Sequence, residues 1–120
     1  IERSRKFYAE VFGMEVTGDR ELSEELMMKL FGAGSRARLV KLKIGDIIVE
    51  LFKFIDMKDQ KTDIPYNIGI SHFALFVGDR KEFIEKLKKL GMETIVADRG
   101  DGNLVYFTKD PDGVLIELRD

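Results

Sequence analysis

The feature that most constrains the fold of this 120-residue chain is an internal repeat. Placing residues 12–14 (FGM) over 90–92 (LGM) superimposes a helix-like segment, a glycine stop and the start of a short strand. Placing residues 45–51 (GDIIVEL) over 112–118 (DGVLIEL) superimposes a turn and a strand. Self-similarity of this kind indicates two copies of one supersecondary unit. We therefore predict an α+β fold built from paired units.

Hydrophobic periodicity and turn residues give each copy a similar order of elements. The second copy is predicted to contain a strand at 70–77, a helix at 80–90 with Asp79 as its N-cap, and three strands at 93–96, 104–108 and 114–118. The first copy is predicted to contain helices at 1–12 and 21–31, and strands at 14–17, 36–43 and 47–54.

The first copy differs from the second in two ways. It spans 37 positions from Gly13 to Glu50, whereas the second spans 26 from Gly91 to Glu117, so it carries 37 - 26 = 11 extra residues. We interpret the segment 21–31 as this insertion. The two copies are offset by 78 positions, since Gly91 falls on Gly13. The counterpart of His72 would therefore lie at position 72 - 78 = -6, about six residues before Ile1. We therefore expect the opening strand of the first copy to be missing from this chain.

Composition limits the chemistry. Hydrophobic residues make up 44% of the chain, charged residues 35%, and the formal net charge is -2, which is typical of a soluble globular protein. We expect neither nucleic acid nor membrane as a partner, and we expect a cytoplasmic location. Because the chain has no cysteine, any metal must be held by His, Asp, Glu or backbone oxygen.

Two glutamates are the most informative polar residues, because Glu50 falls on Glu117 in the repeat and each lies inside an apolar strand. Side chains alternate along a strand, so Glu50 shares a face with Ile48 and Phe52. An unpaired buried carboxylate is costly, so each must meet a partner or water. One interpretation is a solvated sheet face or a pair with a lysine; the other is a shared functional site.

His72 is the only histidine, and it shares a strand face with Ala74 and Phe76. A hydrogen-bonded core histidine is one interpretation. If the strands of both copies curve into one sheet, however, its imidazole would converge with the carboxylates of Glu50 and Glu117. Imidazole with carboxylates suits a divalent metal ion such as Zn, Ni, Mn, Co or Fe.

Other candidates have simpler interpretations. Residues 110–113 (DPDG) have the composition of a turn, and a calcium loop would need more oxygen ligands. Three arginines are either anion-binding or simply exposed: Arg36, Arg38 and Arg99. Four residues of the inserted segment form either a lid over an apolar pocket or an ordinary packing or subunit contact: Met27, Met28, Leu30 and Phe31. The chain shows no Ser/His/Asp grouping, phosphate loop or Rossmann fingerprint.

Four segments resemble the vicinal oxygen chelate superfamily, which includes glyoxalase I and the bleomycin-resistance proteins. They are residues 3–16 (RSRKFYAEVFGMEV), 39–52 (LVKLKIGDIIVELF), 69–77 (GISHFALFV) and 107–118 (FTKDPDGVLIEL). The resemblance implies paired βαβββ modules that form a cupped mixed β-sheet in a homodimer. Residues 1–56 would form module one, 57–68 a linker and 69–120 module two of a single domain.

The resemblance also implies a metal in the cup, held by Glu50, His72, Glu117 and a residue of the missing strand. Glyoxalase I proteins have Glu at the position of Glu50, methylmalonyl-CoA epimerases usually have Gln, and extradiol dioxygenases have no ligand there. The resemblance thus implies a metal-dependent lyase or isomerase of the glyoxalase I type. It would act on a small chelating oxo or hydroxy substrate, such as the thiol adduct of a 2-oxoaldehyde, through an enediolate.

In that reaction Glu117 or Glu50 would move the proton, first as general base and then as acid. Three alternatives stay open at this point. The first is a metal-free resistance protein that binds a small hydrophobic ligand. The others are an iron-dependent extradiol dioxygenase and an epimerase of the same superfamily.

Overall fold

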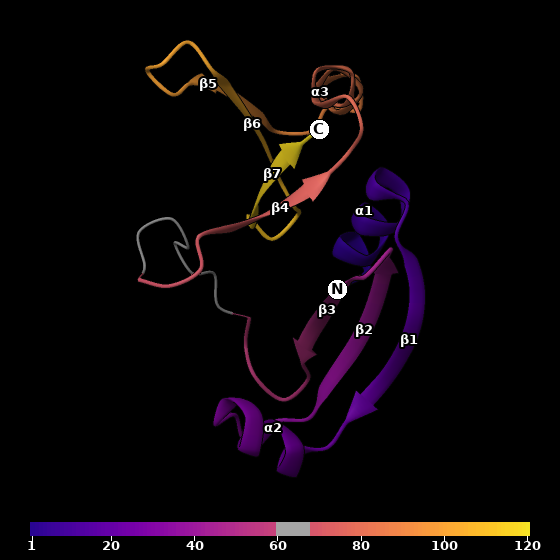
Figure 1. Cartoon of the computed structure of the whole chain (residues 1–120). Coiled ribbons are helices and arrows are strands. Elements are labelled where there is room, and N and C mark those ends of the chain that lie inside the picture. Colours follow the sequence, from indigo (N-terminus) through magenta and orange to yellow (C-terminus); the bar gives the residue numbers. More distant parts are fainter. Residues whose placement is uncertain (60–67) are drawn as a thin grey trace. The chain divides into compact units, whose positions relative to one another are not determined.

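The computed structural model describes residues 1–59 and 68–120 (Figure 1). Its helices and strands, in chain order, are α1 (Glu2–Phe12), β1 (Glu15–Leu22), α2 (Glu24–Phe31), β2 (Ala37–Ile44), β3 (Ile47–Phe54), β4 (His72–Phe76), α3 (Arg80–Lys89), β5 (Thr94–Asp98), β6 (Leu104–Lys109) and β7 (Leu115–Arg119). None of these helices is long and apolar enough to cross a membrane.

The chain divides into two compact units, Ile1–Lys61 and Thr62–Asp120. Within the described residues, the first unit holds a three-stranded sheet in the order β1-β2-β3, and the second a four-stranded sheet in the order β4-β7-β6-β5. The predicted α+β class is confirmed. The predicted linker 57–68 contains the boundary between the units, and its residues 60–67 lie outside the described part of the chain.

In the first unit the three strands form an antiparallel meander, with α1 on one face. Arg38 on β2 donates to Glu2 of α1, from Nη1 to Oε1 at 2.6 Å, so the α1 face carries Arg38 and, by alternation, Val40 and Leu42. Val40 and Leu42 are fully buried. The opposite face of β2 therefore carries Leu39 and Lys41, and these side chains lie away from α1.

The predicted boundary between the first strand and the second helix was wrong. β1 continues to Leu22, and α2 begins only at Glu24. β1 extends because it pairs with β2 along its whole length, with Leu22 opposite Ala37 and a bulge between Val16 and Gly18. Ser23 then caps α2 by accepting a hydrogen bond on Oγ from the amide of Leu26 at 3.3 Å.

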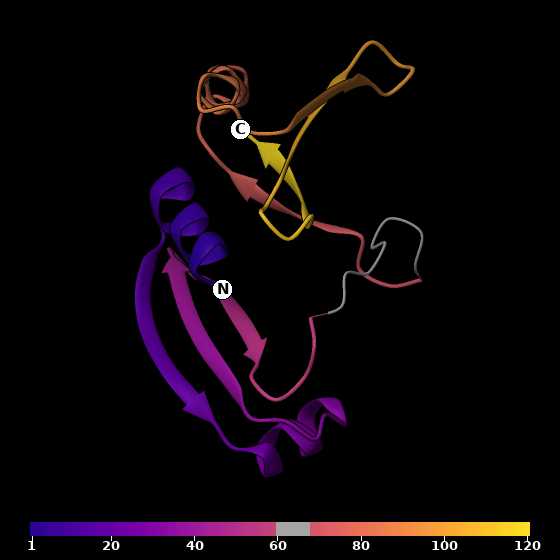
Figure 2. The same ribbon diagram turned by 180° about the vertical axis from the view of Figure 1, so that it is seen from behind.

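The second unit forms a complete βαβββ module. β4 lies parallel to β7, while β6 pairs antiparallel with both β7 and β5, as both views show (Figures 1 and 2). The Arg80 guanidinium of α3 lies 5.1 Å from the centre of the Tyr106 ring, so the Tyr106 face of the sheet is the helix face. Ile84 and Leu87 of α3 are buried, as is Ile116 of β7.

Two local predictions in this unit are confirmed. Asp79 caps α3, with its Oδ1 accepting from the amides of Lys81 at 2.8 Å and Glu82 at 3.0 Å. The segment 110–113 is a turn: the Gly113 amide donates to the carbonyl of Asp110 at 3.0 Å, and Gly113 has a φ of +93°. The positive φ explains why glycine suits this position.

Candidate metal centre

β4 and β7 bring His72 and Glu117 together on one face of the second sheet. In the parallel register His72 lies opposite Leu115 and Ala74 opposite Glu117, so His72 and Glu117 share a face. This is the face away from α3, because the alternate residue Ile116 points to the helix side. The His72 Nε2 lies 3.7 Å from the Glu117 Oε2. This separation exceeds a hydrogen bond, so the two groups face each other without bonding directly.

Neighbouring side chains contact both groups. Glu117 is only 8% exposed, and its Oε1 pairs with Nη2 of Arg119 at 2.9 Å. The Phe107 ring packs edge-on against the His72 ring with centroids 5.3 Å apart. The Ser71 Oγ lies 2.9 Å from the His72 Nδ1. Arg119 thus contacts one carboxylate oxygen of Glu117, and Ser71 contacts one ring nitrogen of His72. The remaining oxygen and nitrogen face each other.

The spacing of the two facing atoms suits a shared metal ion. An ion bound to both at about 2.1 Å in tetrahedral geometry would separate the nitrogen and oxygen by about 3.4 Å. The observed separation of 3.7 Å is close to this value. Imidazole and carboxylate are also a donor set that Zn²⁺ and similar ions accept. His72 and Glu117 therefore fit as two ligands of a divalent metal.

Glu50 lies on the corresponding face of the first sheet, away from α1. It is opposite Lys41 in the register of β2 and β3, and its Oε1 pairs with the Lys41 Nζ at 2.9 Å. The side chains are 40% and 36% exposed, respectively. Residues 1–59 and 68–120 contain no group of three or more His, Asp or Glu side chains arranged to hold a metal. That Glu50 joins His72 and Glu117 therefore stays a prediction from the repeat.

Two of the arginines considered as anion-binding residues are engaged by carboxylates. Arg36 pairs with Glu21 at 2.7 Å and with Asp56 at 3.2 Å. Arg38 pairs with Asp19 through Nη2 at 2.6 Å, besides its bond to Glu2. Hydrogen bonds from the two guanidiniums lower the pKa values of these three acids: Asp56, Asp19 and Glu2. The two arginines link segments that are distant in sequence, which is a structural role.

The inserted helix packs partly on its own sheet. Met27 is fully buried with Leu39 and Ala37, and the Phe31 ring meets the Phe52 ring edge-on at 5.2 Å. Met28 and Leu30 are exposed. Ordinary helix packing accounts for Met27 and Phe31, and the lid interpretation stays a prediction.

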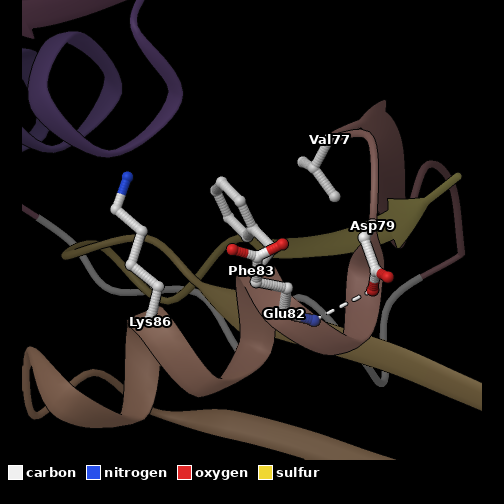
Figure 3. Close-up of a pocket in the computed structure, with 5 residues that line it drawn as sticks. All are labelled: Val77, Asp79, Glu82, Phe83 and Lys86. Carbon is white, nitrogen blue, oxygen red and sulfur yellow. Dashed lines mark hydrogen bonds between the residues drawn. The ribbon is translucent and has the colours of Figure 1, made fainter.

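Sequence reasoning missed a shallow pocket of about 240 Å³ beside the start of α3, between Val77 and the helix (Figure 3). Two of its charged residues, Asp79 and Lys86, already have structural contacts. The Asp79 carboxylate accepts from the Glu82 amide, and the Lys86 Nζ lies 5.4 Å from the centre of the Phe83 ring. None of the predicted site residues lines this pocket, and no motif marked it.

Comparison with known proteins identifies the family. The model of the glyoxalase/bleomycin resistance protein/dioxygenase superfamily matches residues 1–118. The chain belongs to this superfamily. It is 28% identical to a lactoylglutathione lyase of Arabidopsis thaliana, over 98% of the chain and 39% of that protein. It is 27% identical to a probable lactoylglutathione lyase of Vibrio parahaemolyticus, over 98% of the chain and 80% of that protein.

Solved structures of the superfamily share the fold. A glyoxalase family protein from Enterococcus faecalis matches with a TM-score of 0.75 and 27% identity, covering 100% of this chain and 88% of that one. The trypanothione-dependent glyoxalase I of Leishmania major matches with a TM-score of 0.71 and 28% identity, covering 100% and 78%. The chain spans about two fifths of the length of the plant relatives it matches.

Proposed function

We propose that this superfamily member is a metal-dependent lyase or isomerase of the glyoxalase I type. Its substrate would be a small chelating oxo or hydroxy compound, such as the thiol adduct of a 2-oxoaldehyde. The observation that carries the proposal is the His72–Glu117 pair, whose Nε2 and Oε2 face each other at 3.7 Å. The lactoylglutathione lyases among its relatives support the same reaction class.

His72, Glu117 and Glu50 would hold a divalent ion. When bound, the ion supplies Lewis-acid polarisation of the substrate oxygens and stabilises negative charge that develops there. The Arg119 guanidinium holds the Glu117 Oε1, so Oε2 is the oxygen left to face His72. A glutamate oxygen removes the proton from the carbon beside the carbonyl and then delivers it to the former carbonyl carbon.

Glu50 suits this proton transfer better than Glu117. Its side chain is 40% exposed and, within residues 1–59 and 68–120, forms an ion pair only with the flexible side chain of Lys41. The Glu117 side chain is 10% exposed and lies beside Arg119 and His72. A carboxylate that must accept and release a proton needs freedom to move, and a metal anchor needs to stay in place. We therefore assign the anchoring role to Glu117 and proton transfer to Glu50.

Metal titration tests the binding site. Protein stripped with a chelator is titrated calorimetrically with Zn²⁺, Ni²⁺, Co²⁺ and Mn²⁺. His72→Ala and Glu117→Gln are expected to weaken binding by more than about tenfold, since each removes a ligand. Glu85→Gln is the matched control, because Glu85 pairs with Lys88 on the surface of α3. Unchanged dissociation constants in the two site variants would contradict the site.

Turnover tests the reaction class. Metal-loaded protein is incubated with methylglyoxal and glutathione or another thiol, and formation of the 2-hydroxyacyl thioester is followed. The parent and Glu85→Gln are expected to turn over equally. Glu50→Gln is expected to lose turnover by a larger factor than metal affinity, since it replaces the proton carrier. Equal losses of turnover and affinity in Glu50→Gln would contradict its assigned role.

One observation favours a second function, metal-free binding of a small hydrophobic ligand. Each glutamate already has a cationic partner, Lys41 for Glu50 and Arg119 for Glu117. In that case the chelated protein would bind an aromatic compound with the same affinity as the metal-treated protein. Homodimer formation and a cytoplasmic location, both expected from the sequence, stay predictions.

A further inference from the structure

We propose that Ser71 is a positioning residue for His72, and that its hydroxyl accommodates both tautomers of the imidazole. This inference rests on the proposed metal function. Ser71 directly precedes β4 and is half-buried, and its Oγ lies 2.9 Å from the His72 Nδ1. The opposite ring nitrogen, Nε2, faces the carboxylate of Glu117 at 3.7 Å.

The His72 ring has neighbours in three directions. Ser71 contacts Nδ1, Glu117 faces Nε2, and the Phe107 ring packs against the imidazole at an interplanar angle of 73°. A half-turn of the imidazole about χ2 would place ring carbons where Nδ1 and Nε2 now lie. Among these contacts, the Ser71 hydrogen bond is the one that distinguishes Nδ1 from a ring carbon. It therefore selects the orientation in which Nε2 points to Glu117.

The Ser71 hydroxyl matters because it can either donate a hydrogen bond to Nδ1 or accept one from it. Without a metal, a proton on Nε2 is favoured by the facing carboxylate, and the Ser71 hydroxyl donates to the bare Nδ1. With a metal on Nε2, the proton must lie on Nδ1, which then donates to the Ser71 Oγ. A backbone carbonyl could only accept, and an ammonium could only donate. Serine keeps the ring in one orientation through both states.

NMR gives a direct readout, because His72 is the only histidine of the chain. Long-range ¹H–¹⁵N spectra of the neutral ring are recorded with and without Zn²⁺ for the parent, Ser71→Ala and Ser71→Thr. The parent is expected to carry its proton on Nε2 without metal and on Nδ1 with Zn²⁺. Nuclear Overhauser contacts between the His72 and Phe107 ring protons report ring orientation and need no metal.

Ser71→Ala is expected to weaken Zn²⁺ binding about tenfold and to reduce the His72–Phe107 contacts. Ser71→Thr keeps the hydroxyl and is expected to restore both. Ser71→Ala that binds Zn²⁺ as the parent does, with unchanged ring contacts, would overturn the inference while leaving the proposed function intact. If the parent binds none of the metals, the proposed function fails. The positioning role is then judged from the ring contacts alone, and unchanged contacts in Ser71→Ala measured without metal would overturn it.

Discussion

Replacing Lys41 with glutamine tests whether Glu50 is a metal ligand. The Lys41 Nζ lies 2.9 Å from the Glu50 Oε1. If Glu50 binds a metal, its carboxylate has to give up this ion pair. Lys41 then competes with the metal, and Lys41→Gln is expected to bind the metal more tightly than the parent.

The size of the effect follows from the exposure of the pair. Both side chains are more than one third exposed, and such ion pairs contribute about 0.2–1 kcal/mol. Since about 1.4 kcal/mol corresponds to a tenfold change in an equilibrium constant, removing the competitor lowers the dissociation constant by a factor of about 1.4 to 5. Isothermal titration calorimetry of chelator-stripped protein resolves the upper part of this range.

Lys43→Gln is the matched control. Lys43 lies on the same strand and the same face as Lys41, but its partner on β3 is Ile48, and its partner on β1 is Glu15, which is not a proposed ligand. Lys43→Gln therefore removes the same charge from the same strand face and leaves the Lys41–Glu50 pair in place. If the metal dissociation constant falls equally in both variants, the effect comes from the loss of a positive charge near the site and not from release of Glu50. Weaker binding in Lys41→Gln would refute the competition directly.

Two further predictions concern stability. Hydrogen bonds from the backbone amides of Glu82 and Lys81 lower the pKa of Asp79, so the cap stabilises the fold above the usual pKa of Asp and is lost as pH falls through the lowered value. Asp79→Ala should therefore lower the melting temperature at neutral pH but make little difference in strong acid; an equal deficit at both pH values would contradict this. Leu118→Ala should cost about 2–5 kcal/mol in urea unfolding, because Leu118 is 1% exposed. Leu90→Ala, at a side chain 56% exposed, is its control and should change stability far less.

The parts of the fold that depend on residues close together in the sequence could be predicted from it. The Asp79 cap and the turn at 110–113 are local patterns, and the structure has both. The alternation of β3 also placed Glu50 on a face with Ile48 and Phe52, and the β2–β3 register agrees. These predictions succeed because the interaction and its sequence signal lie in the same short segment.

The extent of β1 could not be predicted in this way. Its second half contains Gly18, Asp19 and Arg20, and glycine and aspartate are poor strand formers. They adopt the strand because β2 supplies hydrogen-bonding partners, a contact between segments that propensity does not register. A signal for the start of α2 was present, however, in Ser23 followed by two glutamates, which is a typical N-cap sequence.

The candidate site divides in the same way. The Lys41–Glu50 pair follows from the turn between β2 and β3. The turn places Ile44 opposite Ile47, and three residues further along each strand Lys41 lies opposite Glu50. The hairpin sequence therefore contained this information. The acids that pair with Arg36 and Arg38 come from separate segments, and only the folded chain reveals them.

The repeat explains why the two glutamates correspond, and their strand partners explain why they differ. Glu50 lies opposite Lys41 on β2, whereas Glu117 lies opposite Phe107 on β6. Lysine leaves its carboxylate exposed and held by one flexible ammonium group. Phenylalanine instead packs against His72 beside Glu117, and the planar guanidinium of Arg119, on the same strand, forms an ion pair with that carboxylate. These two differences between equivalent positions are the reason for proposing that Glu117 anchors the metal and that Glu50 transfers the proton.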